Sequence, residues 1–281
     1  MALRRGTREQ RTNEQLREQY EIERELADRL RNASRIERGL LYASLYDELF
    51  RRVPHHPLVA RKSSAEGTAR SVASKMRFLE KFLDRDTTFL EIGPGDCVLS
   101  LAVSRKVKQV IAVEVSRELA ANLVLPQNVQ LIFSDGSSVP VPRDSVDVAY
   151  SHQMMEHLHP EDAVDQARGV FQALRRGGAY ICITPNRLSG PHDISKYFDA
   201  VARGFHLKEY TCTELAGILK SIGFSSVRVQ VRVGRRFVRV PLPFVRLVES
   251  AVGGLSRSPV RRFARSRLVS GFLGIRVVAW K

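Results

Sequence analysis

Short runs rich in β-branched residues alternate with helical segments through the middle of the chain. Five such runs occupy residues 87–92, 110–114, 129–133, 146–150 and 179–184. Parallel strands need a connection of a dozen or more residues, usually a helix, whereas a tight turn can join antiparallel strands. The alternation therefore predicts an open α/β sheet, mostly parallel, with helices on both faces. Two later runs, at 226–233 and 274–280, bring the predicted sheet to seven strands.

The N-terminal part of the chain has a different pattern. Apolar residues recur at helical spacing through residues 9–50 and again through 64–84, with a proline-containing break between the two runs. We therefore expect an N-terminal helical extension at residues 1–74, followed by one α/β domain at 75–281. A basic stretch at about 235–270 is expected to form an insertion between the last two strands.

Charge is unevenly distributed along the chain. The sequence has 45 Lys and Arg against 30 Asp and Glu, a formal net charge of +15. Residues 228–281 alone hold 13 basic side chains and one acidic side chain, whereas residues 89–227 hold 13 and 15. This excess predicts an anionic partner for the C-terminal part: a lipid headgroup, a phosphate-bearing acceptor or a nucleic acid. The alternatives are a plain arginine-rich surface, or a lid whose arginine stems cover a small-molecule pocket.

Several protein classes are disfavoured. No run approaches 18 consecutive apolar residues, and the basic N-terminus lacks a following apolar core, so we expect neither a transmembrane helix nor a signal peptide. The three cysteines, Cys97, Cys182 and Cys212, include no C-x-x-C pair and suit a reducing cytoplasm. The His, Asp and Glu residues show no spacing typical of a metal site, so no metal is predicted.

Residues suited to binding a nucleoside follow the first three predicted strands. The turn Gly93-Pro94-Gly95 lets the backbone approach a ligand closely. Glu114 ends the second strand 21 residues after Gly93, the offset at which a carboxylate accepts from ribose hydroxyls. Asp135, after the third strand, can accept from an adenine amino group, and Gly136 leaves room for the ring. Because the sequence has neither a full G-x-G-x-x-G pattern nor a P-loop lysine here, we expect an adenosine ligand without a pyrophosphate.

These segments resemble the motifs of class I S-adenosylmethionine-dependent methyltransferases. The resemblance covers roughly residues 75–235 plus the last strand, and its motifs are residues 89–95, 112–116, 135–136, 145–157, 174–178 and 184–186. It implies a Rossmann-like sheet whose last strand is antiparallel, and S-adenosylmethionine as the cofactor.

The resemblance also implies roles for eight residues in cofactor binding. They are Glu91, Gly93 and Gly95 beside the methionine moiety, Glu114 at the ribose, Asp135 and Gly136 at the adenine, and Ser151 and His152 near the amine and the sulfonium. One position departs from the family pattern, because Cys97 stands where many members have a third glycine. We expect this larger side chain to shift the loop and to be packed, not catalytic.

Two histidines are the candidate catalytic residues. His157 falls where relatives place a histidine at the mouth of the active site, and His206 lies in a segment that resembles the border of the acceptor pocket. A histidine with a near-neutral pKa suits removal of a hydroxyl proton at cellular pH. The alternative for each is a structural role, and His192 is a third candidate on a loop.

The segment after the fourth predicted strand bears on the methyl acceptor. It reads Ser151-His152-Gln153-Met154 and lacks the Asn-Pro-Pro-Tyr of adenine and glutamine methyltransferases. This argues against base or amide methylation. The segment resembles that of enzymes that methylate hydroxyls, although relatives with carbon and nitrogen acceptors exist, so we expect O-methylation of a small-molecule, sugar or lipid-linked hydroxyl. The basic C-terminal stretch adds the expectation that this cytoplasmic enzyme contacts the inner face of an anionic membrane peripherally. One alternative is a nucleic-acid-binding methyltransferase, disfavoured because few aromatic residues accompany the C-terminal arginines. A non-catalytic adenosine-binding scaffold is the other.

Overall fold

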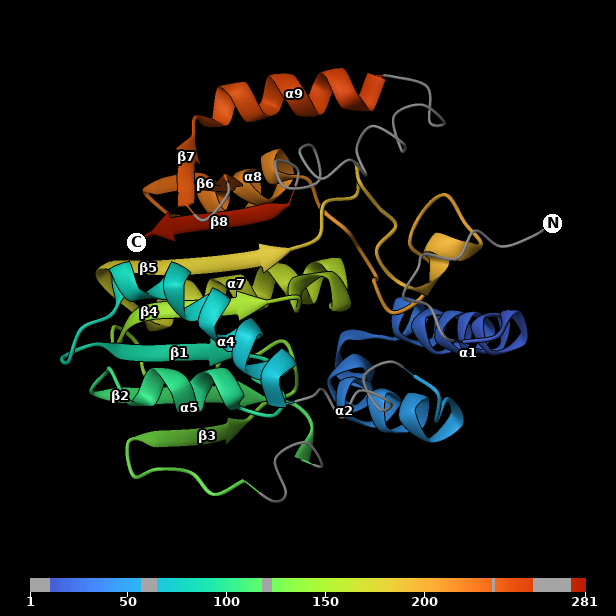
Figure 1. Ribbon diagram of the computed structural model, residues 1–281, viewed down its shortest axis with the longest axis horizontal. Coiled ribbons are helices and arrows are strands. Elements are labelled where there is room, and N and C mark those ends of the chain that lie inside the picture. The colour runs from blue at the N-terminus through green and yellow to red at the C-terminus, as the bar shows by residue number, and fades with distance from the viewer. Residues whose placement is uncertain (1–10, 57–64, 118–122, 234–235, 255–273) are drawn as a thin grey trace.

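A single mixed sheet forms the centre of the molecule (Figure 1). The computed structural model describes residues 11–56, 65–117, 123–233, 236–254 and 274–281. The strands are β1 (Thr88–Ile92), β2 (Gln109–Glu114), β3 (Val129–Phe133), β4 (Val146–His152), β5 (Leu174–Thr184), β6 (Ser226–Val233), β7 (Arg236–Val240) and β8 (Ile275–Trp280). Their order across the sheet is β3-β2-β1-β4-β5-β8-β6-β7.

The first five strands in chain order are parallel, as the alternation of strands and helices predicts. Strand β8 lies between β5 and β6 and runs antiparallel to both, which confirms the expected orientation of the last strand. The prediction of seven strands was wrong by one, because β7 pairs antiparallel with β6 at the edge of the sheet. This strand lies in the stretch that the sequence indicated only as a basic insertion.

Helices cover both faces of the sheet, and alternate residues of each strand pack against them. On one face, α4 (Ala65–Leu79), the short η1 (Glu80–Phe82) and α5 (Val98–Ser104) enclose a core that includes Phe89. On the other face, α7 (Pro160–Ala173) and α8 (Cys212–Ile222) enclose a core that includes Leu90. Phe89 and Leu90, which are neighbours in β1, thus pack on opposite faces of the sheet. A strand that is buried on both faces has a nearly continuous run of apolar residues.

Two N-terminal helices lie beyond the carboxyl ends of the parallel strands (Figure 1). They are α1 (Asn13–Asn32) and α2 (Arg35–Arg52), where the sequence predicted one continuous helical run. The chain breaks at Ala33, and Ser34 caps α2 reciprocally with Glu37, which satisfies two backbone N–H groups that would otherwise lack partners. Helix α2 can therefore fold back across the end of the sheet.

A buried ion pair fixes α2 to α7. Arg38 donates from Nε and Nη2 to the two carboxylate oxygens of Asp162, at 2.7 and 2.8 Å, and Tyr42 Oη donates to the same carboxylate at 2.7 Å. Arg38 and Asp162 are both buried. Removing one partner of such a pair leaves an uncompensated buried charge, so the N-terminal extension is held firmly on the α/β domain.

The proposed domain boundary at 74/75 falls inside α4, so one helix crosses it. Since Met76 and Leu79 of this helix pack in the same core as Phe89, we now propose that the extension ends before α4. In the predicted insertion, α9 (Leu242–Gly254) follows β7, while residues 255–273, with Arg261, Arg262, Arg265 and Arg267, lie outside the described residues. Within the described part of the chain, no helix is long and apolar enough to span a membrane.

Candidate active site

The turn after β1 has the open backbone that a ligand can approach. Gly93 and Gly95 have φ angles of +68° and +58°, in the region that favours glycine. A Cβ on Gly93 would lie 3.1 Å from Sδ of Met154, whereas a Cβ on Gly95 would meet no atom within 4 Å. The space beside Gly95 is therefore free on the protein side, as a close ligand contact requires.

Glu114 ties the end of β2 to this turn. Its Oε2 accepts from the backbone N–H of Gly95 at 2.9 Å, and its Oε1 accepts from the N–H groups of Val115 and Ser116 at 2.7 and 3.1 Å. An ionised carboxylate has about four acceptor positions, so one position remains, on Oε2. A ribose hydroxyl is a donor that fits this position.

Glu91, at the end of β1, is buried and accepts a hydrogen bond from Oγ of Ser100 on α5 at 2.6 Å. Burial raises the pKa of Glu91 to about 7, against the opposing effect of the Ser100 hydrogen bond. Because this pKa is near neutral, a cation placed beside Glu91 would lower it and convert the carboxyl group to its ionised form.

The loop after β3 is covered by α2. Asp135 accepts from the backbone N–H groups of Ser137 and Ser138 through Oδ1, at 3.0 and 2.7 Å, and these bonds outweigh burial and lower its pKa. Gly136 has a φ of +88°, and a Cβ there would come within 2.8 Å of the Tyr42 ring. The loop predicted to face adenine is thus packed between the sheet and an N-terminal helix.

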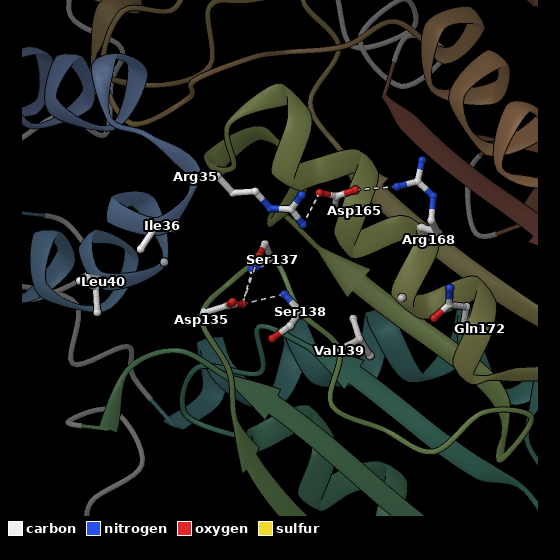
Figure 2. A pocket seen from close by; sticks show the side chains of 12 residues that line it. Arg35, Ile36, Leu40, Asp135, Ser137, Ser138, Val139, Asp165, Arg168 and Gln172 are labelled. Atoms are coloured by element: carbon white, nitrogen blue, oxygen red, sulfur yellow. Dashed lines mark hydrogen bonds and ion pairs between the residues drawn. The ribbon is translucent and has the colours of Figure 1, made fainter.

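A pocket of about 900 Å³ opens between α2, this loop and α7 (Figure 2). Asp135 lines it, but none of the other predicted cofactor residues does. Arg35 and Arg168 both point toward Asp165, with N–O distances of 2.7 and 2.6 Å (Figure 2). The carboxylates of Asp165 and Asp135 together equal the two arginines in number, so the lining of the pocket has no formal net charge. We therefore place it at the outer side of the adenine loop and not at the centre of the site.

Ser151 and His152 point to opposite faces of the sheet, as consecutive strand residues do. Oγ of Ser151 shares a 2.8 Å hydrogen bond with Oη of Tyr180 inside the core. The His152 ring stacks on Tyr150, and burial together with nearby Lys75 lowers its pKa to about 4. The two side chains cannot both line one side of a cofactor, so the roles assigned to them stay predictions.

Cys97 is the N-cap of α5 and has a φ of +54°, so the position that departs from the family pattern still adopts a conformation typical of glycine. Its side chain is fully buried, and burial raises the pKa of the thiol to about 12. A thiol that stays protonated is a poor nucleophile, in agreement with a packing role.

The structure brings the two candidate catalytic histidines together. His157 ends η2 (Met155–His157), and His206 lies on the segment between β5 and α8, yet their ring centroids are 4.9 Å apart. Nδ1 of His157 pairs with the carbonyl oxygen of Phe205 at 3.0 Å, and Nδ1 of His206 pairs with Oε1 of Glu209 at 2.7 Å. Among the residues that the structure describes, neither Nε2 atom has a hydrogen-bond partner, so both are left for another group.

Electrostatics distinguish the two rings. Burial lowers the pKa of His157 to about 3, and nearby His206 adds to this effect. Burial also opposes charge on His206, but the hydrogen bond that its ring donates to Glu209 and the nearby Glu156 carboxylate outweigh it and raise its pKa. His157 is thus a neutral ring, whereas His206 holds a proton more readily.

Three residues beside the histidines were missed by sequence reasoning: Tyr46, Glu156 and Glu209. The Tyr46 ring from α2 meets the His157 ring edge-on, with centroids 6.0 Å apart, and its hydroxyl lies within electrostatic reach of Glu156 and Glu114. Tyr46 therefore links the histidine pair to the cofactor-binding strand ends. Glu209, three residues after His206, carried a usable signal as a short-range acid–histidine pair.

His192 lies outside this pair. Its Nε2 contacts Oγ of Ser189 and the carbonyl oxygen of Asn186, at 3.0 and 3.1 Å, while its backbone N–H donates to Glu209. It lies on the loop between β5 and η3 (Ile194–Tyr197). His192 thus helps to position Glu209, and the third catalytic candidate gains no support.

Comparison with known proteins identifies this arrangement. Residues 90–182 match the family model described as a methyltransferase domain. This segment is a methyltransferase domain, of the S-adenosylmethionine-dependent class I type that the sequence resembles. The matched segment of this methyltransferase begins in β1 and ends in β5, so it includes the glycine turn, Glu114, Asp135 and His157.

Solved structures agree with the methyltransferase fold. An S-adenosylmethionine-dependent methyltransferase from Archaeoglobus fulgidus is 16% identical, with a TM-score of 0.51. The match covers 76% of this chain and 94% of that one. A chain from a complex of the Haloferax volcanii Trm112 methyltransferase activator is 14% identical, with a TM-score of 0.54 over 76% of this chain and 92% of that one. At these identities the likeness concerns the fold. No curated protein matches the sequence.

The family uses S-adenosylmethionine, and the residues of this methyltransferase fit that cofactor. The open space at Gly95 accommodates a ligand close to the backbone, and Glu114 retains one acceptor position for a ribose hydroxyl. Glu91 supplies a buried carboxyl group near the same turn. We propose that these residues, with Gly93 and Asp135, hold the cofactor. The room for an adenine ring expected beside Gly136 is instead filled by the Tyr42 ring, so that prediction was wrong.

Proposed function

We propose that this methyltransferase methylates a hydroxyl of a small-molecule, sugar or lipid-linked acceptor, with His157 and His206 at the acceptor. The observation that carries the proposal is the pairing of two imidazoles whose Nδ1 atoms are occupied by Phe205 and Glu209. Each ring therefore keeps its Nε2 atom for contact with an acceptor. His157, whose pKa is lowered to about 3, is a weak base and can accept a hydrogen bond from a hydroxyl, whereas His206, whose pKa is raised, is the stronger base of the two and the one better suited to take the proton.

S-adenosylmethionine, when bound, supplies an activated methyl group on a sulfonium, so the protein mainly has to orient the acceptor and remove its proton. Orientation of the histidines comes from their fixed Nδ1 partners, as in other sites where a third group orients a catalytic base. The ring of Tyr46 packs against His157 and Phe205, which gives the acceptor an aromatic wall from the N-terminal extension.

A labelled-methyl assay tests this function. The protein is incubated with S-adenosylmethionine carrying a labelled methyl group and with aqueous and lipid fractions of a lysate, and mass spectrometry locates the methylated atom. We expect methyl transfer to oxygen. Substitutions His157→Gln and His206→Gln should lower the rate about 10²- to 10⁴-fold, the usual contribution of a positioned base, while cofactor binding persists.

The matched control is His55→Gln, because His55 follows α2 in the N-terminal extension and its Nε2 contacts the backbone oxygen of Gln15 in α1. Its rate should equal that of the wild type. A product methylated on carbon or nitrogen would contradict the proposed acceptor class. Unchanged rates in both histidine variants would remove the catalytic roles and leave the family assignment intact.

An exposed surface on α9 and β7 supports a lipid-linked acceptor. Phe244 and Leu247 of α9 are 51% and 67% exposed, and Val238 of β7 is 47% exposed. Arg239 and Arg246, which are next to Val238 and Leu247 in the sequence, are exposed as well. Apolar side chains with flanking arginines suit an anionic membrane surface. Sedimentation with vesicles should show binding that requires anionic lipid and weakens in Phe244→Ser/Leu247→Ser; equal binding to neutral vesicles would argue against this surface.

A further inference from the structure

The histidine pair has an unsatisfied carboxylate oxygen beside it. Glu156 is fully buried, and its Oε2 accepts from Oγ1 of Thr184 at 2.8 Å. Its Oε1 has no hydrogen-bond partner among the residues that the structure describes. A buried polar atom without a partner costs roughly 1–3 kcal/mol, so this oxygen points to a donor or cation that the protein atoms do not supply.

Two imidazole rings lie next to this oxygen. One ligand atom from each of Glu156, His157 and His206 lies within 4.8 Å of the other two. Two ligands each about 2.1 Å from the same ion are at most about 4.2 Å apart, and about 3.4 Å apart in a tetrahedral site. An inward movement of about 1 Å would therefore bring the three atoms to coordination distance, and small side-chain rotations can provide it.

The surroundings of the three side chains match those of metal ligands. Ligating histidines almost always donate their other ring N–H to a carboxylate or a backbone carbonyl, which fixes the tautomer and aims the free nitrogen at the metal. Glu209 has this role for His206, and the carbonyl of Phe205 has it for His157. Glu209 is itself fixed by the backbone N–H of His192 at 2.7 Å, and Thr184 fixes Glu156.

We propose that Glu156, His157 and His206 form a binding site for one divalent transition-metal ion of the zinc class. The ligands are Oε1 of Glu156 and the Nε2 atoms of the two histidines. Two imidazoles and one carboxylate form the ligand set of catalytic zinc sites and of non-haem iron sites, both of which keep open coordination positions. Magnesium and calcium prefer all-oxygen ligands and should bind poorly.

The metal site rests on these three side chains and deepens the proposed function at the same place. The two Nε2 atoms kept for the acceptor would be ligands in the metal-bound protein. A hydroxyl acceptor would then meet the metal at an open position instead of the bare rings. Metal binding can be measured without any acceptor, so the two proposals can fail separately.

The test uses tag-free, full-length protein stripped with a chelator. Calorimetric titration with Zn²⁺ and Co²⁺, and the absorption spectrum of the Co²⁺ form, should show one ion per chain with nitrogen and oxygen ligands. Glu156→Gln, His157→Gln and His206→Gln should each weaken binding at least about 100-fold, and Glu209→Gln about 10- to 100-fold. Glu80→Gln, at an exposed carboxylate paired with Lys106, is the matched control and should leave binding unchanged.

Each outcome decides the proposal. Absence of binding by wild-type protein that still binds S-adenosylmethionine would overturn it, as would binding that all four site variants retain. A thiolate-to-cobalt absorption band would place the ion at a cysteine and would also overturn it; this readout needs no variant, so a variant that fails to fold does not remove the test. Metal binding without methyl transfer to oxygen would support the site and count only against the proposed acceptor.

Discussion

The carboxylate of Glu114 accepts a hydrogen bond from the backbone N–H of Gly95 at 2.9 Å, so the acid that ends β2 is tied directly to the turn that follows β1. This bond fixes the two parts of the predicted cofactor site relative to one another before any ligand arrives. Preorganisation of this kind reduces the entropy lost on binding.

Gly95→Ala should separate ligand contact from stability. A Cβ at this position meets no protein atom within 4 Å, so the folded protein should lose only about 1 kcal/mol for the positive φ of a non-glycine residue. We expect the affinity for S-adenosylmethionine to fall at least about 10-fold, because the new methyl group fills the space beside the turn. Calorimetry and denaturant unfolding measure the two effects, and wild-type affinity would place the ligand elsewhere.

Gly136→Ala should loosen the contact between α2 and the loop after β3. The added Cβ would come within 2.8 Å of the Tyr42 ring, whereas a Cβ on Gly177 would meet nothing within 4 Å. Both glycines have positive φ, +88° and +82°, so Gly177→Ala is the matched control for backbone strain. We expect Gly136→Ala to lower the free energy of unfolding by about 1–3 kcal/mol more than the control, as overpacking does. Equal losses would mean that Tyr42 does not pack on this loop.

Asp162→Asn should be strongly destabilising. It leaves the buried Arg38 guanidinium without the carboxylate that binds it through two hydrogen bonds, and the largely exposed Glu161 becomes its remaining ion-pair partner among the described residues. Breaking a buried pair typically costs about 3–5 kcal/mol. Glu66→Gln removes an exposed pair with Arg70, whose side chains are 83% and 75% accessible, and should cost less than about 0.5 kcal/mol. Denaturant unfolding compares them, and similar small losses would show that the extension is not fixed by this pair.

Glu91 should make stability depend on pH. Burial raises its folded-state pKa to about 7, above the ordinary value of 4.5, so between these values the folded protein holds a proton that the unfolded chain has lost. The stabilisation from this group is fully present below pH 4.5 and is lost as the pH rises to about 7. The total change is about 3 kcal/mol.

Glu91→Gln removes this titration, while the Ser100 hydroxyl can still donate to the amide oxygen. The free energy of unfolding of the variant, relative to the wild type, should therefore rise between pH 4.5 and 7 and then level off. Unfolding curves at pH 5, 6, 7 and 8 measure the difference, in which the other titrating groups cancel. A constant difference across this range would show that Glu91 has an ordinary pKa.

Local sequence patterns predicted most of the sheet. The run 129–133 matches β3, a short segment rich in apolar residues, and 226–233 matches β6, in which valines alternate with polar residues. The break between α1 and α2 was missed, although Ser34 and Glu37 have the spacing of a capping box. Strand β7 was missed because its arginines interrupt the apolar pattern by which the sequence indicates a strand. The sequence also predicts a helix through residues 117–124, of which 118–122 lie outside the described residues.

The sequence predicted the site residues that follow successive strands, but it did not predict the contacts that form only when distant segments pack together. Glu114 and Gly95 follow from their place after successive strands, which parallel topology brings to one edge. Glu156 and His206 are far apart in sequence, and no spacing rule relates them. Only the packing of the segment after β5 against η2 brings them together, so the prediction of no metal had no access to this cluster. The role of Tyr46 depends on how α2 crosses the strand ends, which also lies beyond local sequence.

Calorimetric titration of S-adenosylmethionine into wild-type protein and Glu114→Ala tests the central claim most directly. Glu114 accepts three backbone N–H groups and retains one acceptor position for the ribose, so its loss removes both the ligand bond and the bonds that shape the turn. The account predicts one cofactor per wild-type chain and at least about 100-fold weaker binding by a folded Glu114→Ala variant. Equal affinity in the two proteins, or no binding by the wild type, would contradict it.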